Sequence, residues 1–249
     1  MIEKHLDITS ADGAMNSFVV YPEEGGPWPV VLFYMDAPGK REELHDMARR
    51  IAAVGYYVVL PNLYYRKTRE FTLTVRDEAG MAAMFALMNH LTNALVVRDT
   101  DAMLRFADAQ PEADASRVGA VGYCMSGPFV MAAAAAFPDR FKGIAAIHGA
   151  NLVTDREDSA HLMAPRIRCE SYFACAEIDK WAPPELVEKL QAALTASGAP
   201  TIWRHDGSWS DSEGASVADS MSPSQIRRAS GNLRPTPNAL VETRNPGAD

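Results

Sequence analysis

The amino-acid sequence predicts an α/β protein built on a mostly parallel, eight-stranded sheet with helices on both faces. Short apolar runs alternate with longer stretches of helical periodicity from the N-terminus to about residue 205, which is typical of successive βαβ units. The runs at 29–35, 56–61 and 117–122 are apolar on both faces, as expected for central strands covered by helices. With 249 residues, the chain can bury such a core without help from disulfides or a metal.

The elements follow from apolar runs and from helical spacing. Strands are predicted at 4–9, 15–21, 29–35, 56–61, 117–122, 142–147, 170–175 and 200–205. Helices are predicted at 42–54, 75–90, 92–109 and 131–136, and a further helix begins near Pro183. In the first helix, Leu44, Met47 and Ile51 recur on one face, and Gly55 is expected to cap its C-terminus.

The composition is that of an ordinary globular protein. The chain is 47% hydrophobic and carries a net charge of -8 without a Lys/Arg cluster, which argues against nucleic-acid binding. No apolar stretch is long enough to span a membrane, and no secretory signal is visible. The three cysteines do not suggest a disulfide framework, and Cys169 and Cys175 are expected to be core thiols. We therefore expect a cytoplasmic protein, monomeric or weakly homodimeric, with no membrane partner, cofactor or metal.

The character of the sequence changes near Trp203. From there to Asp249 the chain is rich in small and polar residues, and its few large aliphatic residues fit neither a helical face nor an alternating strand. We expect residues 1–205 to form the domain and residues 206–249 to form an irregular or disordered tail. A shifted reading frame would produce the same kind of segment, so the origin of the tail stays open.

The run 122–127 (GYCMSG) lies between a predicted strand and a predicted helix. A nucleophile on a sharp strand-to-helix turn needs small neighbours, because the strand and the helix approach each other closely. Gly122 and Gly127 supply this room, and Ser126 is a small residue where a second Gly often stands. The helix N-terminus also favours a thiolate. The run predicts Cys124 as the nucleophile of an α/β-hydrolase, and the alternative is a buried core thiol.

The chain resembles the dienelactone hydrolase family, small α/β-hydrolases that use Cys in place of Ser. The resemblance extends over about residues 5–202 and rests on the Gly-Tyr-Cys elbow and on three further segments. These segments are 35–39 (MDAPG), 61–65 (PNLYY) and 172–179 (YFACAEID). The resemblance implies a carboxymethylenebutenolidase-like enzyme that hydrolyses carboxylic esters or lactones.

The resemblance also implies roles for individual residues. Asp179 matches the acid of a catalytic triad, with Glu177 as an alternate, whereas the structural alternative for Asp179 is to cap the following helix. The backbone N–H groups of Ala37 and Met125 match an oxyanion hole. Further residues expected to support the nucleophile or to line the substrate pocket are Asp36 (where Glu is usual), Gly122, Gly127, Tyr64, Tyr123 and His148. Two interpretations are open for Arg66, Lys67 and Arg69: contact with a substrate carboxylate, or solvated loop charges.

The triad histidine is not at its expected place. The family pattern beyond the eighth strand resembles Gly-x-x-His-Gly-Phe, but here Ser210 falls where the His is expected. His205, at the end of the last predicted strand, is the only histidine after Asp179 and is the candidate base. Two functions are therefore open. The chain is either a hydrolase that uses Cys124 with an Asp/His pair, or a catalytically impaired homologue that binds a small carbonyl compound or acts through a reactive thiol.

Overall fold

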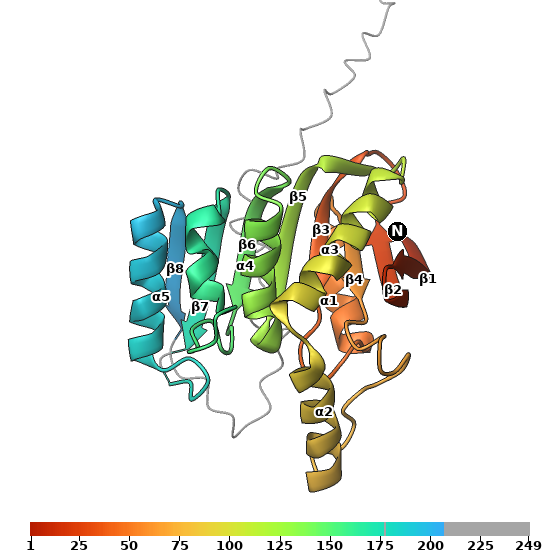
Figure 1. The fold of residues 1–249 in the computed structure, drawn as a ribbon. Helices are drawn as coiled ribbons and strands as arrows, with labels where there is room; N and C mark the ends of the chain where they lie inside the picture. The colour runs from red at the N-terminus through yellow and green to blue at the C-terminus, as the bar shows by residue number, and fades with distance from the viewer. Residues whose placement is uncertain (177, 207–249) are drawn as a thin grey trace, which may run out of the picture.

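The computed structural model describes residues 1–176 and 178–206, the last three of them by their backbone only. Within these residues the sheet has eight strands in the order β1-β2-β4-β3-β5-β6-β7-β8 (Figure 1). Strand β2 runs antiparallel to both of its neighbours, and the remaining pairs from β4 to β8 are parallel. The predicted α/β-hydrolase fold is confirmed. The predicted tail lies outside the described residues beyond Asp206.

The element bounds agree closely with the sequence prediction. The strands are Ile2–Ser10 (β1), Gly13–Tyr21 (β2), Trp28–Tyr34 (β3), Tyr57–Pro61 (β4), Ala113–Tyr123 (β5), Phe141–Ile147 (β6), Glu170–Ala176 (β7) and Thr201–Asp206 (β8). The helices are Glu42–Ala52 (α1), Glu78–His90 (α2), Asn93–Asp108 (α3), Gly127–Ala136 (α4) and Pro184–Ser197 (α5), with short 3-10 turns at Cys124–Ser126 (η1) and Ala160–Arg166 (η2). The prediction missed η2 and placed one cap wrongly. Ala53 is the C-cap of α1, and Gly55 lies two residues beyond it at φ +97°.

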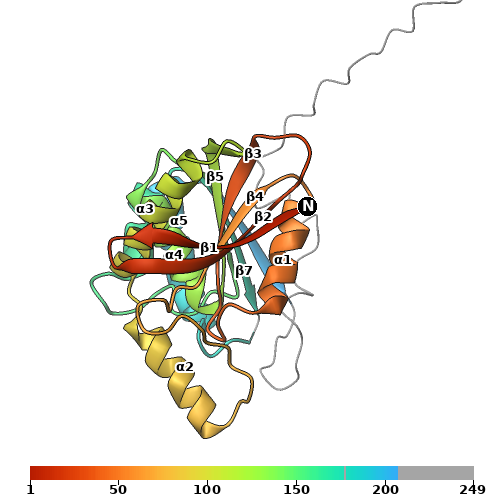
Figure 2. The same cartoon turned by 90° about the vertical axis from the view of Figure 1, so that its right-hand side faces the viewer.

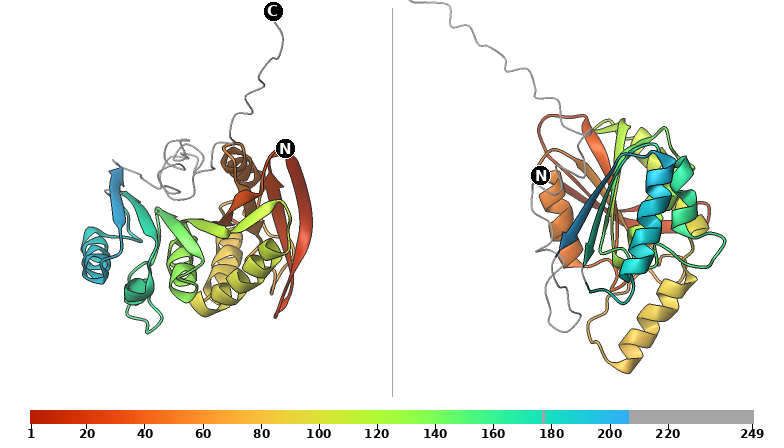
Figure 3. Two further views of the ribbon diagram at one scale, coloured as in Figure 1. Left: turned by 90° about the horizontal axis from the view of Figure 1, so that it is seen from above. Right: turned by 90° about the vertical axis from the view of Figure 1, so that its left-hand side faces the viewer.

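Helices cover the sheet on both faces. Helices α3, α4 and α5 lie on one face and α1 lies on the other (Figure 3). The buried side of α1, which includes Leu44, Met47 and Ile51, packs on β2 and β4. Helix α4 is buried almost all round, because its run of alanines lets it pack closely against β5, β6, α3 and η2. The core therefore lies on both sides of β3 and β5, next to the turn that follows β5.

Two side-chain caps explain where α2 and α3 begin. The Asp77 carboxylate accepts the Gly80 N–H at 2.8 Å, and the Thr92 hydroxyl accepts the Leu95 N–H at 3.2 Å. The second cap starts a new helix just after α2 ends, and the two helices are bent by 76° at this break. Helix α2 therefore projects away from the body of the molecule (Figure 2). No single helix of the described part is long and apolar enough to cross a membrane, and α2 and α3 pass that test only as a pair across the bend.

Strand β1 forms one edge of the sheet. Its residues alternate between exposed and partly buried positions, because only one of its faces packs against the body. Two of its acidic side chains pair with arginines from other segments, Glu3 with Arg49 at 2.9 Å and Asp7 with Arg69 at 2.9 Å. The edge of the sheet is thus lined by charged side chains.

A buried ion pair joins the loop after β4 to α3. The Arg66 guanidinium contacts both carboxylate oxygens of Asp99, at 2.7 and 2.9 Å, and also pairs with Asp12 at 2.7 Å. The Tyr65 hydroxyl donates to Asp99 at 2.8 Å. The Arg66 side chain is only 9% exposed, so its interpretation as a solvated loop charge is wrong, whereas contact with a substrate carboxylate stays a prediction. The ion pair holds the loop that carries Tyr64.

Candidate active site

Cys124 lies on a sharp turn between β5 and α4. It directly follows the last residue of β5, and its backbone has φ +52°, a conformation that costs free energy for a residue with a side chain. The 3-10 turn η1 then leads straight into α4. Cys124 is exposed, so its interpretation as a buried core thiol is wrong. This is the strand–turn–helix geometry that presents a nucleophile in α/β-hydrolases.

The two glycines of the elbow lie where the backbone segments nearly touch. A Cβ atom on Gly122 would lie 2.5 Å from the carbonyl oxygen of Ser126, and one on Gly127 would lie 2.6 Å from the Cα atom of Gly149. Real Cβ atoms essentially never approach backbone so closely. Both positions therefore have no space for a side chain, as predicted. At Gly122 the space is taken by the backbone of the turn itself, and at Gly127 by the loop after β6.

Ser126 ties the elbow to the end of β3. It is fully buried, and its hydroxyl donates to the carbonyl oxygen of Met35. The sequence interpretation considered only the small size of this residue and missed its hydroxyl. A serine where a strand and a helix were expected to approach closely is the signal that would have pointed to a hydrogen-bond partner.

The two residues of the predicted oxyanion hole are both in contact with the Tyr64 hydroxyl. Met125 is in the first helical turn after β5, where backbone N–H groups lack a carbonyl one turn earlier, and Ala37 is in the loop after β3. The Tyr64 hydroxyl donates to the Ala37 carbonyl oxygen at 2.8 Å and lies 3.4 Å from the Met125 sulfur. Tyr64, predicted to line the pocket, is only 2% exposed and packs between these two residues. Burial and the nearby charges of Asp36 and Cys124 raise the pKa of Tyr64 well above its usual value, so the hydroxyl stays protonated.

Asp36 pairs with an arginine of its own loop. Its two carboxylate oxygens accept from Arg41 at 2.6 and 3.0 Å, and Arg41 also pairs with Glu43 at 2.6 Å. Asp36 is 3% exposed; burial raises the pKa of its carboxyl, and Arg41 opposes this by favouring the charged form. The ion pair holds the loop that carries Ala37, and support of the thiol by Asp36 stays a prediction.

Asp179 lies in the loop after β7. Its carboxylate accepts the Trp181 N–H at 2.8 Å, which closes a short turn. The N-cap of α5 is Pro183, so the structural alternative for Asp179, capping of this helix, is wrong. Asp179 is close enough to Cys175 that its charge, together with burial, raises the pKa of this thiol to about 11. Glu177, the alternate acid, lies outside the described residues.

The remaining predicted residues, His148, His205 and Tyr123, lie at or near the carboxyl ends of β6, β8 and β5. His148 follows β6 with φ +48°, and its N–H donates to the Ala174 carbonyl at 2.8 Å. His205 belongs to β8, where its backbone pairs with Cys175, so it lies within the strand and not in the loop beyond it. Tyr123 lies in the core, 1% exposed, and its ring meets that of Phe33 at 5.8 Å.

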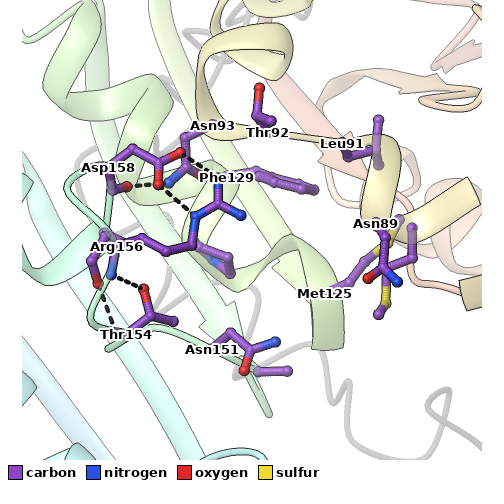
Figure 4. A pocket seen from close by; sticks show the side chains of 15 residues that line it. Asn89, Leu91, Thr92, Asn93, Met125, Phe129, Asn151, Thr154, Arg156 and Asp158 are labelled. Carbon is purple, nitrogen blue, oxygen red and sulfur yellow. Dashed lines mark hydrogen bonds and ion pairs between the residues drawn. The ribbon is translucent and has the colours of Figure 1, made fainter. Parts of the chain in front are cut away.

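A cavity of about 450 Å³ lies beside the elbow, between the α2–α3 junction, the start of α4 and the loop after β6 (Figure 4). Its lining residues are Met88, Asn89, Leu91, Thr92, Asn93, Met125, Pro128, Phe129, Ala150, Asn151, Thr154, Arg156, Asp158, Ser159 and Ala160. The Asn93 amide donates to the Asp158 carbonyl oxygen at 2.6 Å and so links α3 to the loop. Arg156 pairs with the Asp158 carboxylate at 2.8 Å, which makes the polar side of the cavity nearly neutral. The sequence interpretation missed this cavity, because its walls come from distant segments.

The cavity is connected to the elbow by two of its walls. Met125, the residue after Cys124, lines it, and Ala150 donates its N–H to the Cys124 carbonyl oxygen at 2.9 Å. Within the described residues, no group of three or more His, Cys, Asp or Glu side chains is arranged to hold a metal ion.

Comparison with known proteins gives a consistent family assignment. The sequence profile of the Dienelactone hydrolase family matches residues 15–205. A relative from Methylorubrum extorquens is 31% identical over 145 residues, 58% of this chain and 48% of that protein. The carboxymethylenebutenolidase of Pseudomonas putida is 28% identical over 144 residues, 57% of this chain and 61% of that protein. These alignments thus span about half to three fifths of the length of the relatives.

A solved structure has the same fold. The dienelactone hydrolase from Anabaena variabilis superposes with a TM-score of 0.65 at 16% identity, over 92% of this chain and 95% of that one. At this level of identity the likeness concerns the fold alone. The family profile, in contrast, spans most of the sequence and includes the whole elbow. The chain belongs to the dienelactone hydrolase family.

Proposed function

We propose that this chain hydrolyses carboxylic esters or lactones with Cys124 as the nucleophile. One observation carries the proposal: in a member of this family, Cys124 is exposed at the end of a central strand, in a backbone conformation with φ +52° that is maintained by the packing of two glycines. Strain of this kind persists where the surrounding structure enforces it, and it clusters at active sites. The relative from Pseudomonas putida named carboxymethylenebutenolidase supports the lactone part of the proposal.

In the proposed reaction, the Cys124 sulfur attacks the carbonyl carbon of the ester. A C–S bond forms, and the carbonyl π electrons move to the oxygen, which is held by the N–H groups of Met125 and Ala37. The oxyanion electrons re-form the carbonyl as the C–O bond to the leaving alcohol breaks, and the alkoxide takes up the proton that the thiol has given to the base. Water cleaves the resulting thioester, which releases the acid and restores the thiol.

Asp179 with a histidine is the proposed acid–base pair. Asp179 follows β7 and His205 is near the end of the adjacent strand β8, so both belong to the edge of the sheet at which Cys124 lies. In this role, Asp179 holds an imidazole in the required tautomer and balances the charge of the imidazolium.

A second function is favoured by one observation. His205 lies within β8, with its backbone paired to Cys175, whereas a triad base is expected in the loop beyond the strand. This supports the alternative of a chain that binds a small carbonyl compound, or reacts through its thiol, with little turnover.

The cavity beside the elbow is the proposed site for the organic part of the substrate. Met125, Phe129 and Leu91 give it an apolar wall, whereas Asn89 and Asn151 give it neutral polar groups. Because Arg156 and Asp158 neutralise each other, uncharged substituents suit this cavity better than carboxylates. Asn89→Trp should narrow it and raise KM for para-nitrophenyl butyrate more than for para-nitrophenyl acetate.

The test is hydrolysis of para-nitrophenyl acetate and of dihydrocoumarin by the full chain. Cys124→Ala should lower kcat by at least about a thousandfold, because the nucleophile acts as a unit with its base. Cys175→Ala is the matched control and should leave kcat within about twofold, since this thiol is buried in the sheet.

His205→Ala then separates the two functions. A loss of kcat as large as that of Cys124→Ala would support His205 as the base. Weak turnover that is insensitive to His205, together with rapid alkylation of Cys124, would support the impaired homologue. Equal ester cleavage by the wild type and by Cys124→Ala would contradict both.

A further inference from the structure

The Tyr64 hydroxyl contacts both residues that form the proposed oxyanion hole. It donates to the Ala37 carbonyl oxygen at 2.8 Å and lies 3.4 Å from the Met125 sulfur. Ala37 comes from the loop after β3 and Met125 from the turn after β5, so the same hydroxyl joins the two sides of the hole. We propose that Tyr64 is a positioning residue that holds the backbone of Ala37 so that the Ala37 N–H, together with that of Met125, binds the oxyanion. This inference rests on the proposed function.

The Tyr64 hydroxyl acts on the N–H of Ala37 through the carbonyl group of the same residue. The Ala37 N–H and the Ala37 carbonyl belong to successive peptide units that meet at the Ala37 Cα atom, so holding the carbonyl restricts the orientation of the N–H through the two backbone dihedrals of this residue. Loops move more easily than strands, and this loop also carries Gly39 at φ +96°, a conformation that residues with side chains rarely adopt. An oxyanion hole in a loop therefore needs side-chain support.

Tyr64 is itself held rigidly. It is 2% exposed, its N–H donates to the Asn62 side chain at 2.9 Å, and its ring meets that of Phe71 at 5.8 Å. The segment that follows Tyr64 is bound to α3 through Arg66, whose guanidinium contacts both oxygens of the buried Asp99 carboxylate. The position of the hydroxyl is thus set by the body of the domain and not by the loop that it supports.

Ser126 supports the same loop nearer to the end of β3. Its hydroxyl donates to the Met35 carbonyl, two residues before Ala37, so it joins the same two segments at the strand end. Ser126 fixes the base of the loop, whereas Tyr64 reaches the residue that supplies the N–H. This separation predicts that loss of the Tyr64 hydroxyl weakens binding of an oxyanion more than it weakens the fold.

The experiment compares Tyr64→Phe with Tyr65→Phe in the full chain. Both substitutions remove one buried or partly buried hydroxyl from adjacent tyrosines, but the Tyr65 hydroxyl contacts Ser10 and Asp99, away from the elbow. The probe is benzyl trifluoromethyl ketone. The Cys124 sulfur adds to its carbonyl carbon, a C–S bond forms, the π electrons move to the oxygen, and no group leaves. The adduct is reversible and carries the oxyanion for as long as it persists, so fluorine NMR measures its population at equilibrium and hence its Kd.

Tyr64→Phe should raise the Kd of this adduct by about tenfold, less than the hundredfold or more expected when an oxyanion donor itself is removed. It should lower kcat for para-nitrophenyl acetate by a similar factor and leave KM unchanged. Tyr65→Phe should change each of these by less than about twofold. Alkylation of Cys124 by iodoacetamide, which displaces iodide and forms no oxyanion, should proceed at the wild-type rate in both variants.

Other outcomes separate this inference from the proposed function. An unchanged adduct Kd in Tyr64→Phe overturns the inference, and so does a parallel tenfold loss in the alkylation rate, which would mean that Tyr64 acts on the thiol. A wild type that forms no adduct also overturns it, even where esters are cleaved. A wild type that cleaves no ester, but whose adduct is weakened by Tyr64→Phe, supports the inference and contradicts the proposed function.

Discussion

Cys124 and Cys175 occupy similar places in the sheet and differ in almost every other respect. Both lie at the carboxyl ends of parallel strands, Cys124 just after β5 and Cys175 one residue before the end of β7. At β5 the backbone turns at φ +52° and leaves the side chain exposed. At β7 the strand continues, the backbone pairs with His205, and the side chain is 3% exposed. The backbone of the strand end, and not the residue type, makes one thiol accessible.

The largest expected difference is in the rate of alkylation. Burial, with the charge of Asp179, raises the pKa of Cys175 to about 11. Near neutral pH its thiolate fraction is below about one in a thousand, and its burial slows the reaction further. Iodoacetamide should therefore label Cys124 at least about a thousandfold faster than Cys175, as measured by mass spectrometry of the digested protein.

The pH dependence sharpens this comparison. Because the thiolate is the reactive form, labelling of Cys175 should rise about tenfold per pH unit and level off only near pH 11, provided that the protein stays folded. Cys169, whose pKa burial raises to about 12, should be slower still. Equal labelling of the three thiols in the folded protein at neutral pH would contradict the assignment of Cys124.

The second expected difference is in the stability cost of changing a small residue shortly before each cysteine, Gly122 or Ala174. Gly122→Ala would place a Cβ atom 2.5 Å from the Ser126 carbonyl oxygen, so the turn has to shift, and we expect a loss of about 2 kcal/mol in the free energy of unfolding. Ala174→Gly, in the straight strand β7, should cost only about 1 kcal/mol, mainly through added backbone freedom in the unfolded chain. Urea unfolding measures both. Only Gly122→Ala should also change the rate at which Cys124 is alkylated, and a wild-type rate in this variant would show that the turn tolerates a side chain.

The smallest expected difference is in the free energy of unfolding when each of two buried serines, Ser126 and Ser171, is replaced by alanine. Ser126→Ala removes the hydrogen bond to the Met35 carbonyl and should lower the free energy of unfolding by about 1 kcal/mol. Ser171, in β7, is equally buried, but its hydroxyl has no hydrogen-bond partner among the described residues. Ser171→Ala should therefore be neutral or slightly stabilising. Thermal unfolding of the two variants checks the order, and a larger loss for Ser171→Ala would reverse it.

The contrast between local and distant contacts also explains what could be predicted from sequence. The strands and helices follow from periodicity within short windows, and the elbow is one contiguous run whose glycines and cysteine are neighbours. The supporting contacts are not local: Ser126 and Met35 are 91 residues apart, and Tyr64 and Ala37 are 27 apart. No periodicity encodes such pairs, because they depend on how separate segments pack.

The sequence did not predict the cavity or settle the role of His205, because both depend on how separate segments pack. Asn93 and Asp158, which join two walls of the cavity, are 65 residues apart, and the turn η2, whose first residue Ala160 lines the cavity, was not predicted. His205 was placed correctly at the end of the last strand, but a strand position alone does not specify the direction of its side chain. The roles of Cys124, Asp179 and His205 therefore stay predictions that depend on the experiments above.

The charged edge strand β1 has a consequence for aggregation. A strand at the edge of a sheet offers unpaired backbone groups to which a strand of another molecule can add. Glu3 and Asp7 are each engaged by an arginine from another segment, and Lys4 lies over the ring of Tyr21. A second chain that extended the sheet at β1 would have to crowd these charges and remove them from water, which costs free energy. The strand thus opposes the growth of the sheet into fibrils while it completes the fold.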